Sequence, residues 1–233
     1  MLLEIDDLST SYGDTPIIRD LSMECAQDEI LTILGRNGMG KTTLMRSIMG
    51  ILPADKGTIT FNEEEISSLE PYQRARKGIT LVPQGKDIFP DLTIDENLQM
   101  GSFSNSGTNR ISKEDIFKYF PVLEDRSTQK GKTLSGGQQQ MLAIARGLMT
   151  DPRLLLLDEP SEGVQPSILK ELQSILVEIH QDNNISIIIV EQNIELAFSV
   201  ANRGYFIENG QMSVEGSIDE LQDDKIIQDK IGI

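Results

Sequence analysis

Residues 35–42 read Gly35-Arg36-Asn37-Gly38-Met39-Gly40-Lys41-Thr42, which fits the phosphate-loop pattern G-x-x-x-x-G-K-[ST]. The apolar, partly β-branched stretch from Glu29 to Leu34 predicts a buried strand before it, and Thr43 to Met49 predict a helix after it. A loop between a strand and a helix points backbone N–H groups and the positive helix terminus at an anion. An incidental glycine-rich turn would need neither flanking element. We therefore expect this loop to bind the phosphates of a nucleoside triphosphate.

The residue types in this loop each have a chemical reason. Gly35, Gly38 and Gly40 permit backbone angles and a close approach to phosphate that a side chain would block. Lys41 supplies a mobile positive charge for the β- and γ-phosphates, and Thr42 offers a hydroxyl to a Mg²⁺ ion that bridges them. The loop alone predicts nucleotide binding but does not name the reaction.

The composition predicts a water-soluble globular chain. Its 233 residues are 38% hydrophobic, enough for one large α/β domain or a core with a smaller lobe. The formal charge of −16 disfavours nucleic acid as a partner and broad adhesion to anionic lipid. The single cysteine, Cys25, fits a reducing compartment, and the acidic N-terminus does not resemble a signal peptide. No apolar run approaches membrane-spanning length, so we expect a cytoplasmic protein that is soluble when isolated.

The order of the remaining segments predicts a mostly parallel sheet with an added β layer. Apolar and polar residues alternate from Leu2 to Leu8 and from Ile17 to Cys25, as in half-buried strands. Roughly residues 85–150 are helical in pattern, which predicts a helical lobe with a mobile loop at Ser102 to Asn109. Asn209-Gly210 predicts a hairpin turn near the end of the chain. Buried strands are expected at Ile79–Val82, Leu154–Leu157 and Ile185–Val190, with a helix at Pro166–Gln181.

Two carboxylates follow the strand of four leucines. Asp158 comes at its carboxyl end, where it can hold Mg²⁺ directly or through water. Glu159 is the next residue, close enough to orient or deprotonate a water aimed at the γ-phosphate. A solvated acidic turn accounts poorly for two acids directly after an uncharged strand. We therefore expect both side chains at the nucleotide site.

A second helix start has the composition of an anion site. Ser135, Gly136 and Gly137 precede a long helical pattern and supply a hydroxyl and free backbone N–H groups. An ordinary helix cap would explain Ser135 but not the two glycines. Tyr12 is open to two interpretations, because an aromatic ring ahead of the phosphate loop could stack on a nucleobase or simply end a strand.

The order of these motifs resembles the ATP-binding subunit of an ATP-binding-cassette (ABC) transporter over essentially the whole chain. The resemblance implies an α/β phosphate-loop NTPase with a mostly parallel core sheet, an N-terminal antiparallel β layer and an inserted α-helical lobe. Residues 1–233 are then a single cassette ATPase domain, with the lobe at roughly 85–150. The implied cofactors are ATP and Mg²⁺.

The resemblance also assigns roles by position. Tyr12 lies where the family stacks an aromatic on adenine, Gln84 matches its lobe-coupling glutamine, and Leu134 to Gln138 match its signature sequence. Asp158 matches the Mg²⁺ aspartate and Glu159 the catalytic glutamate. We expect catalysis from Glu159 and Gln192, and metal binding from Thr42, Gln84 and Asp158. ATP binding is expected from Tyr12, Gly35, Arg36, Asn37, Gly38, Met39, Gly40, Lys41, Thr42, Thr43, Gln84, Ser135, Gly136, Gly137 and Gln138.

Two departures from the family pattern narrow the resemblance. Gln192 replaces the usual histidine, and Gln165 replaces the usual aspartate after the two acids. Val190 to Asn193 are similar to cassettes of branched-chain amino-acid importers, and Ser161 to Ile168 look closer still to the urea importers of that group. We therefore predict an ATPase that drives urea import, with branched-chain amino-acid import as the alternative.

The implied partners are transmembrane permease subunits, a second cassette that is homologous or identical, and, indirectly, a periplasmic or extracellular solute-binding protein. Phe89 to Leu98 resemble the family's contact region for membrane partners, so the protein is expected at the cytoplasmic face of the membrane. A soluble cassette ATPase acting on ribosomes or DNA is disfavoured by the single cassette, the absence of heptads and the negative charge. A regulator without turnover is disfavoured by the intact Lys41, Asp158 and Glu159.

Overall fold

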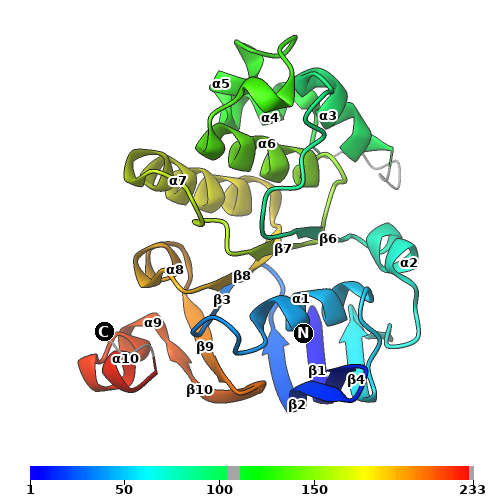
Figure 1. The fold of residues 1–233 in the computed structure, drawn as a ribbon, viewed down its shortest axis with the longest axis vertical. Helices are drawn as coiled ribbons and strands as arrows, with labels where there is room; N and C mark the ends of the chain where they lie inside the picture. Colours follow the sequence, from blue (N-terminus) through cyan, green and yellow to red (C-terminus); the bar gives the residue numbers. More distant parts are fainter. Residues whose placement is uncertain (104–110, 231–233) are drawn as a thin grey trace.

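The computed structural model describes residues 1–103 and 111–230, so the predicted loop at Ser102 to Asn109 lies mostly outside the described residues. The described part is elongated, with the helices α3 to α6 at one end, the N-terminal strands at the other and a second sheet between them (Figure 1). No helix in this part of the chain is both long and apolar enough to cross a membrane.

The smaller sheet is antiparallel and holds the N-terminal strands in the order β2-β1-β4-β5. Its strands are β1 (Leu3–Tyr12), β2 (Thr15–Cys25), β4 (Lys56–Phe61) and β5 (Glu64–Glu65). The predicted antiparallel β layer is therefore confirmed.

Strand β1 runs to Tyr12, beyond the predicted end at Leu8. Its register shifts against both neighbours around Asp7, which has a left-handed φ of 48°. This β-bulge reverses which residues face the core, so the period-two pattern stops although the strand continues.

The larger sheet has the order β10-β9-β3-β8-β7-β6, and every neighbouring pair except β10 and β9 is parallel. Its strands are β3 (Ile30–Leu34), β6 (Ile79–Val82), β7 (Leu154–Asp158), β8 (Ser186–Glu191), β9 (Arg203–Glu208) and β10 (Gln211–Ser217). The mostly parallel core sheet and the hairpin at Asn209-Gly210 are both confirmed.

The helices of the described residues are α1 (Lys41–Met49), α2 (Pro71–Arg76), α3 (Ile94–Ser102), α4 (Lys113–Tyr119), α5 (Pro121–Glu124), α6 (Gly136–Leu148), α7 (Pro166–Asn183), α8 (Ile194–Val200), α9 (Ile218–Leu221) and α10 (Asp224–Lys230). The helices predicted at Thr43–Met49 and Pro166–Gln181 are present as α1 and α7, whereas α2 was not predicted. Because β6 and β7 pair directly, α3 to α6 form the predicted helical insertion between two neighbouring strands.

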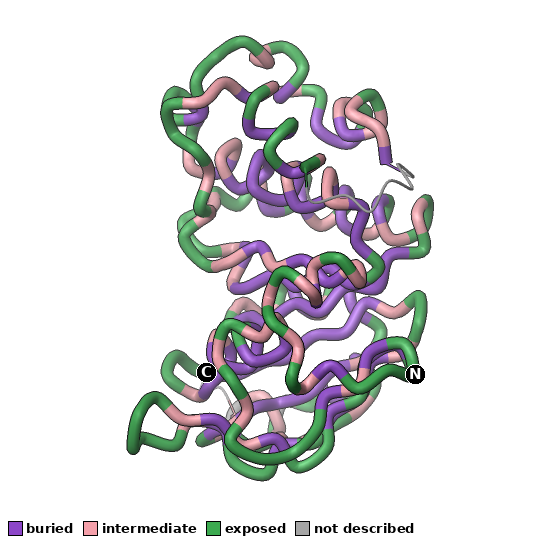
Figure 2. The backbone as a smooth tube through the Cα atoms, turned by 90° about the vertical axis from the view of Figure 1, so that its right-hand side faces the viewer, coloured by how far each residue is buried: buried purple, intermediate pink, exposed green. Residues whose placement is uncertain are grey.

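The central parallel strands are buried on both faces, which explains why they are mostly apolar instead of alternating. Leu155 and Leu157 of β7 pack with the helices α6 and α7, whereas Leu154 and Leu156 pack with α1 and the N-terminal β layer. Buried residues accordingly follow the central strands, and exposed residues lie on the outer turns (Figure 2). This sheet aligns the carboxyl ends of β3, β7 and β8, since Leu34 pairs with Glu191 and Asp158 with Val190.

Candidate functional site

The phosphate-loop pattern lies between the end of β3 and the start of α1, as predicted. Gly40 is the N-cap of α1 and has a φ of 106°, which side chains rarely adopt. A Cβ at this position would also come within 2.9 Å of Cδ1 of Ile18. The backbone conformation thus calls for glycine at residue 40, and a side chain there would also displace the end of Ile18.

The hairpin turn between β9 and β10 contacts the phosphate loop directly. The N–H of Gly210 donates to the carbonyl of Met39 at 3.0 Å. A Cβ on Gly210 would collide with the carbonyl oxygen of Ile17, so only glycine allows this contact. A turn far along the sequence therefore holds the phosphate loop in place.

Lys41 lies at the centre of the site and is only 3% exposed. Its Nζ donates to the carbonyl oxygens of Gly35 at 2.7 Å and Arg36 at 3.1 Å. The same atom is 3.0 Å from Oε1 of Glu159, with which it forms an ion pair. The lysine is therefore already surrounded by oxygen acceptors, the type of partner that a phosphate group supplies.

Asp158 and Thr42 form the polar contact between β7 and α1. The hydroxyl of Thr42 donates to Oδ1 of Asp158 at 3.2 Å. Burial raises the pKa of the Asp158 carboxyl, and the hydrogen bond from Thr42 lowers it in part. A nearby cation would favour the ionised form, because an opposite charge compensates for lost hydration.

These two side chains can serve Mg²⁺. The ion binds through one or two carboxylates together with substrate phosphates and water, so it needs no large cluster of protein ligands. Within the described residues, no group of three or more His, Cys, Asp or Glu side chains could hold a metal alone. One carboxylate beside one hydroxyl fits the role that Mg²⁺ plays with a nucleotide, where it neutralises phosphate charge.

Glu159 has an unusual backbone for a residue at this position. Its φ is 48°, in the left-handed region, which costs a non-glycine residue about 1–3 kcal/mol. Its N–H donates to the carbonyl of Val190 at 2.9 Å, and its own carbonyl accepts from Glu162 at 3.1 Å. The side-chain Oε2 accepts a long 3.5 Å hydrogen bond from Nε2 of Gln84. The surrounding structure thus fixes the backbone of Glu159, and Lys41 and Gln84 contact its carboxylate.

A pocket of about 350 Å³ joins most of these groups. It brings together predicted residues from the phosphate loop, from the segment after β6 and from the end of β7. Its lining is Ile17, Asn37, Gly38, Gly40, Lys41, Thr42, Thr43, Gln84 and Glu159. The other predicted site residues do not line it: Tyr12, Gly35, Arg36, Met39, Ser135 to Gln138, Asp158 and Gln192.

Tyr12 is the last residue of β1 and is 44% exposed. Its hydroxyl accepts a hydrogen bond from Nη1 of Arg46 at 3.2 Å. The strand-end interpretation therefore describes its position, and stacking on a nucleobase stays a prediction.

Ser135 is the N-cap of α6, where its hydroxyl accepts from the N–H of Gln138 at 3.4 Å. Gln138 returns a bond through Oε1, which accepts from the N–H of Ser135 at 3.1 Å, and this completes a capping box. Gly137 also has a packing reason, because a Cβ there would lie 2.8 Å from Cγ2 of Ile168. The ordinary cap thus explains more of this stretch than the sequence alone indicated. Its role in binding phosphate stays a prediction.

Gln192 follows β8 directly and its side chain is exposed. Its N–H donates to the carboxylate of Glu191, which is buried and also accepts from Ser161 and Asn193. Sequence reasoning assigned Glu191 no role. The available signal was a carboxylate in direct continuation of a strand that has no other charged residue.

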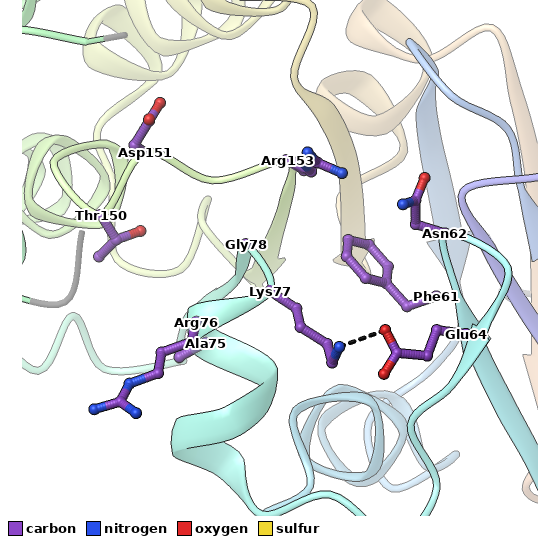
Figure 3. Close-up of a pocket in the computed structure, with 10 residues that line it drawn as sticks. All are labelled: Phe61, Asn62, Glu64, Ala75, Arg76, Lys77, Gly78, Thr150, Asp151 and Arg153. Carbon is purple, nitrogen blue, oxygen red and sulfur yellow. Dashed lines mark hydrogen bonds and ion pairs between the residues drawn. The ribbon is translucent and has the colours of Figure 1, made fainter. Parts of the chain in front are cut away.

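A second pocket, of about 390 Å³, lies at the amino ends of β6 and β7, and its ten lining residues are drawn in Figure 3. None of them belongs to the phosphate loop. Lys77 points to Glu64 across the pocket and pairs with that carboxylate. Asp151 and Arg153 add further charges of both signs to its lining. Because it presents mixed charge and contains none of the predicted site residues, we assign it no function.

Comparison with known proteins agrees with this geometry. The family model described as ABC transporter matches residues 18–162. The chain is 39% identical over 212 residues to the high-affinity branched-chain amino acid transport ATP-binding protein BraG of Pseudomonas aeruginosa, covering 91% of each chain. It is 30% identical to the probable branched-chain amino acid transport ATP-binding protein LivF of Archaeoglobus fulgidus, covering 94% of each.

Among solved structures, the chain is similar to the ADP conformation of MJ1267, an ATP-binding cassette of an ABC transporter. The TM-score is 0.80 at 27% identity, and the match covers 97% of each chain. The family match, the relatives and the phosphate-loop geometry lead to one conclusion: the chain belongs to the ABC transporter family and is an ATPase of that family.

Proposed function

We propose that this chain is the ATP-hydrolysing subunit of an importer for branched-chain amino acids, acting at the cytoplasmic face of a membrane permease. Residues 1–233 act as a single cassette domain. The observation that carries the proposal is the meeting of Lys41, Thr42, Asp158 and Glu159 at the carboxyl ends of β3 and β7. Parallel α/β sheets bind nucleotides at this edge.

The roles proposed for the side chains follow from their atoms. Lys41 binds the phosphates, while Thr42, Gln84 and Asp158 hold Mg²⁺. Glu159 orients the attacking water or accepts its proton, because its carboxylate lies next to the lysine that binds the phosphates. Gln192 senses the γ-phosphate through its amide, which cannot change charge near neutral pH.

The cargo is proposed from kinship. Two relatives aligned over more than nine-tenths of their length are named for branched-chain amino acid transport. These relatives favour our alternative prediction over urea. Urea remains the second candidate because of the stretch from Ser161 to Ile168, although this stretch follows Glu159 at the ATP site and has no contact with a transported solute.

A surface for the permease is proposed at Phe89. The ring is 40% exposed, and the guanidinium carbon of Arg146 lies 4.9 Å from its centroid. Both residues line a hollow of about 220 Å³ that also includes Met100. Ile88, by contrast, packs against the core of the helical insertion. Phe89 thus presents more accessible apolar surface to a helix of the permease than the neighbouring Ile88 does.

The second cassette is proposed from an incomplete site. Ser135 to Gln138 do not line the pocket of the phosphate loop in their own chain. Head-to-tail pairing of two cassettes would bring this helix start to the phosphate loop of the other chain, where its N–H groups can face the γ-phosphate. The solute-binding protein acts only indirectly, through the permease.

Uptake measurements test the cargo. The gene is deleted, and uptake of labelled leucine and labelled urea is measured side by side, with complementation by wild type and by Lys41→Ala. Lost leucine uptake with unchanged urea uptake, restored only by wild type, is the expected result. Lost urea uptake with normal leucine uptake would reverse the order of the two candidates. Normal uptake of both would contradict the proposed cargo class.

A further inference from the structure

Glu191 is a buried carboxylate at the end of β8, with 1% of its surface exposed. Its Oε1 accepts from the N–H of Ser161 at 2.8 Å. Its Oε2 accepts from the hydroxyl of Ser161 at 2.9 Å and from the N–H groups of Gln192 and Asn193, each at 3.1 Å. The Glu191 carboxylate therefore binds two separate segments, the loop at Ser161 and the residues Gln192 and Asn193.

The four hydrogen bonds that this carboxyl accepts favour its ionised form. Burial raises the pKa of Glu191, and the donors from Ser161, Asn193 and Gln192 oppose that shift. The three backbone partners can only donate, so a proton on Oε1 would face an N–H group, and a proton on Oε2 could be accepted only by the Ser161 hydroxyl. The site is built for an acceptor on both oxygens.

The two loops held by Glu191 are those next to the predicted catalytic groups. Ser161 is two residues after Glu159, and Gln192 is the residue that replaces the family's histidine. The backbone carbonyl of Glu191 also accepts from the N–H of Gly35 at 3.3 Å, which is the first residue of the phosphate loop. One residue thus contacts three segments that surround the nucleotide pocket.

The Ser161 loop also reaches the start of α6. The carbonyl oxygen of Gly163 lies 3.5 Å from the place that a Cβ on Gly136 would take. Movement of this loop would therefore shift both Glu159 and the start of α6, which is proposed to face the other cassette.

We propose that Glu191 is a positioning residue of the ATPase reaction, whose carboxylate locks the loop after Glu159 to the loop that carries Gln192. The strained backbone of Glu159 needs such support, because a left-handed conformation persists only where its surroundings impose it. The inference rests on the ATPase activity of the chain and is independent of the cargo.

Glutamine is the informative substitution because it keeps the shape. In Glu191→Gln, an amide nitrogen at the Oε1 position would face the N–H of Ser161, and at the Oε2 position it would face the N–H groups of Gln192 and Asn193. Neither orientation satisfies all donors. Ser161→Ala is the milder change, because it removes the hydroxyl and leaves the three backbone bonds.

The test compares Glu191→Gln and Ser161→Ala with Glu29→Gln, a matched control at the opposite end of the parallel sheet. Glu29 also accepts a backbone hydrogen bond, from Ala26 at 2.6 Å, and it pairs with Arg203. The measurements are kcat and KM for Mg²⁺-ATP, affinity for a fluorescent ATP analogue, melting temperature, and amide hydrogen exchange. The kinetic measurements use a protein concentration above which the wild-type rate per chain no longer rises.

In Glu191→Gln we expect kcat to fall on the order of tenfold to a hundredfold, as small misplacements of catalytic groups do, while ATP affinity stays near wild type. Amides of Ser161, Gln192 and Asn193 should exchange faster. Ser161→Ala should lie between wild type and Glu191→Gln in kcat, and Glu29→Gln should keep the wild-type kcat.

A wild-type kcat in Glu191→Gln would overturn the proposal, as would a kcat loss matched by Glu29→Gln. Parallel losses of ATP affinity and melting temperature would show a general structural role instead. If Glu191→Gln does not fold, Ser161→Ala decides: unchanged kcat with faster exchange at Ser161 contradicts the positioning role.

Discussion

The Nζ atom of Lys41 lies 3.0 Å from Oε1 of Glu159, although Lys41 follows β3 and Glu159 follows β7, two strands separated by β8 in the sheet. The cation predicted to bind phosphate and the carboxylate predicted to activate water therefore contact each other directly. For ATP to reach Lys41, a phosphate oxygen must take the place of the carboxylate. This exchange would leave Glu159 free to face the attacking water.

Replacing Lys41 with alanine should impair ATP binding. The change removes a buried cation and leaves the Glu159 carboxylate without its partner, so the pocket becomes more negative where phosphate must enter. Titration with a fluorescent ATP analogue measures the effect, and Lys56→Ala on the exposed start of β4 is the control. Wild-type affinity in Lys41→Ala would show that another group binds the phosphates.

ATP should bring two chains together head to tail in a Glu159→Gln background. Sizing experiments should show a dimer with ATP, and Ser135→Arg should abolish it by filling the helix start. Ser112→Arg is a matched control, since Ser112 caps α4 with the same capping-box geometry. Both variants lose a helix cap that contributes about 1 kcal/mol to stability. Equal loss of dimer in both variants would mean that the cap alone matters. If the partner is a different cassette, the isolated protein stays monomeric and mixing with that cassette is decisive.

Gln192 should matter less than Glu159. An amide can donate or accept a hydrogen bond near the γ-phosphate but cannot take a proton, so Gln192→Ala should slow turnover less than Glu159→Gln does. Gln192→His should be tolerated. Steady-state ATPase rates of the three variants give the ranking. A Gln192→Ala protein as inactive as the Glu159 variant would contradict it.

Phe89 should couple the cassette to the permease without supporting its fold. Because the ring is partly exposed, Phe89→Ala should leave the melting temperature of the isolated subunit nearly unchanged while uncoupling hydrolysis from uptake. Phe120 is the control, since it is fully buried in the same helical insertion and its truncation should cost about 3–5 kcal/mol. A comparable drop in melting temperature in both variants would identify Phe89 as a core residue.

Much of the fold could be predicted because its signals are local. The phosphate loop demands a strand before it and a helix after it, and the leucine strand ends at Asp158 in the structure as in the sequence. The extension of β1 to Tyr12 could not be predicted, since the bulge at Asp7 depends on register against two neighbouring strands.

The candidate site divides in the same way. Residue types and order placed Lys41, Thr42 and Glu159 in one pocket. The left-handed backbone of Glu159 and the hydrogen bonds of Glu191 could not be predicted, because both depend on contacts between loops that are distant in sequence. The transported solute could not be predicted from the site, since the residues that suggested urea lie beside the ATP site.

Turnover and ATP binding measured together in Glu159→Gln test the central claim most directly. Glutamine keeps the shape of the side chain and removes its ability to accept a proton. We predict that hydrolysis of Mg²⁺-ATP falls by roughly a hundredfold or more, the usual size of general-base assistance. ATP affinity should be kept or improved, because the carboxylate no longer competes for Lys41. Hydrolysis at the wild-type rate would show that the wrong carboxylate has been assigned.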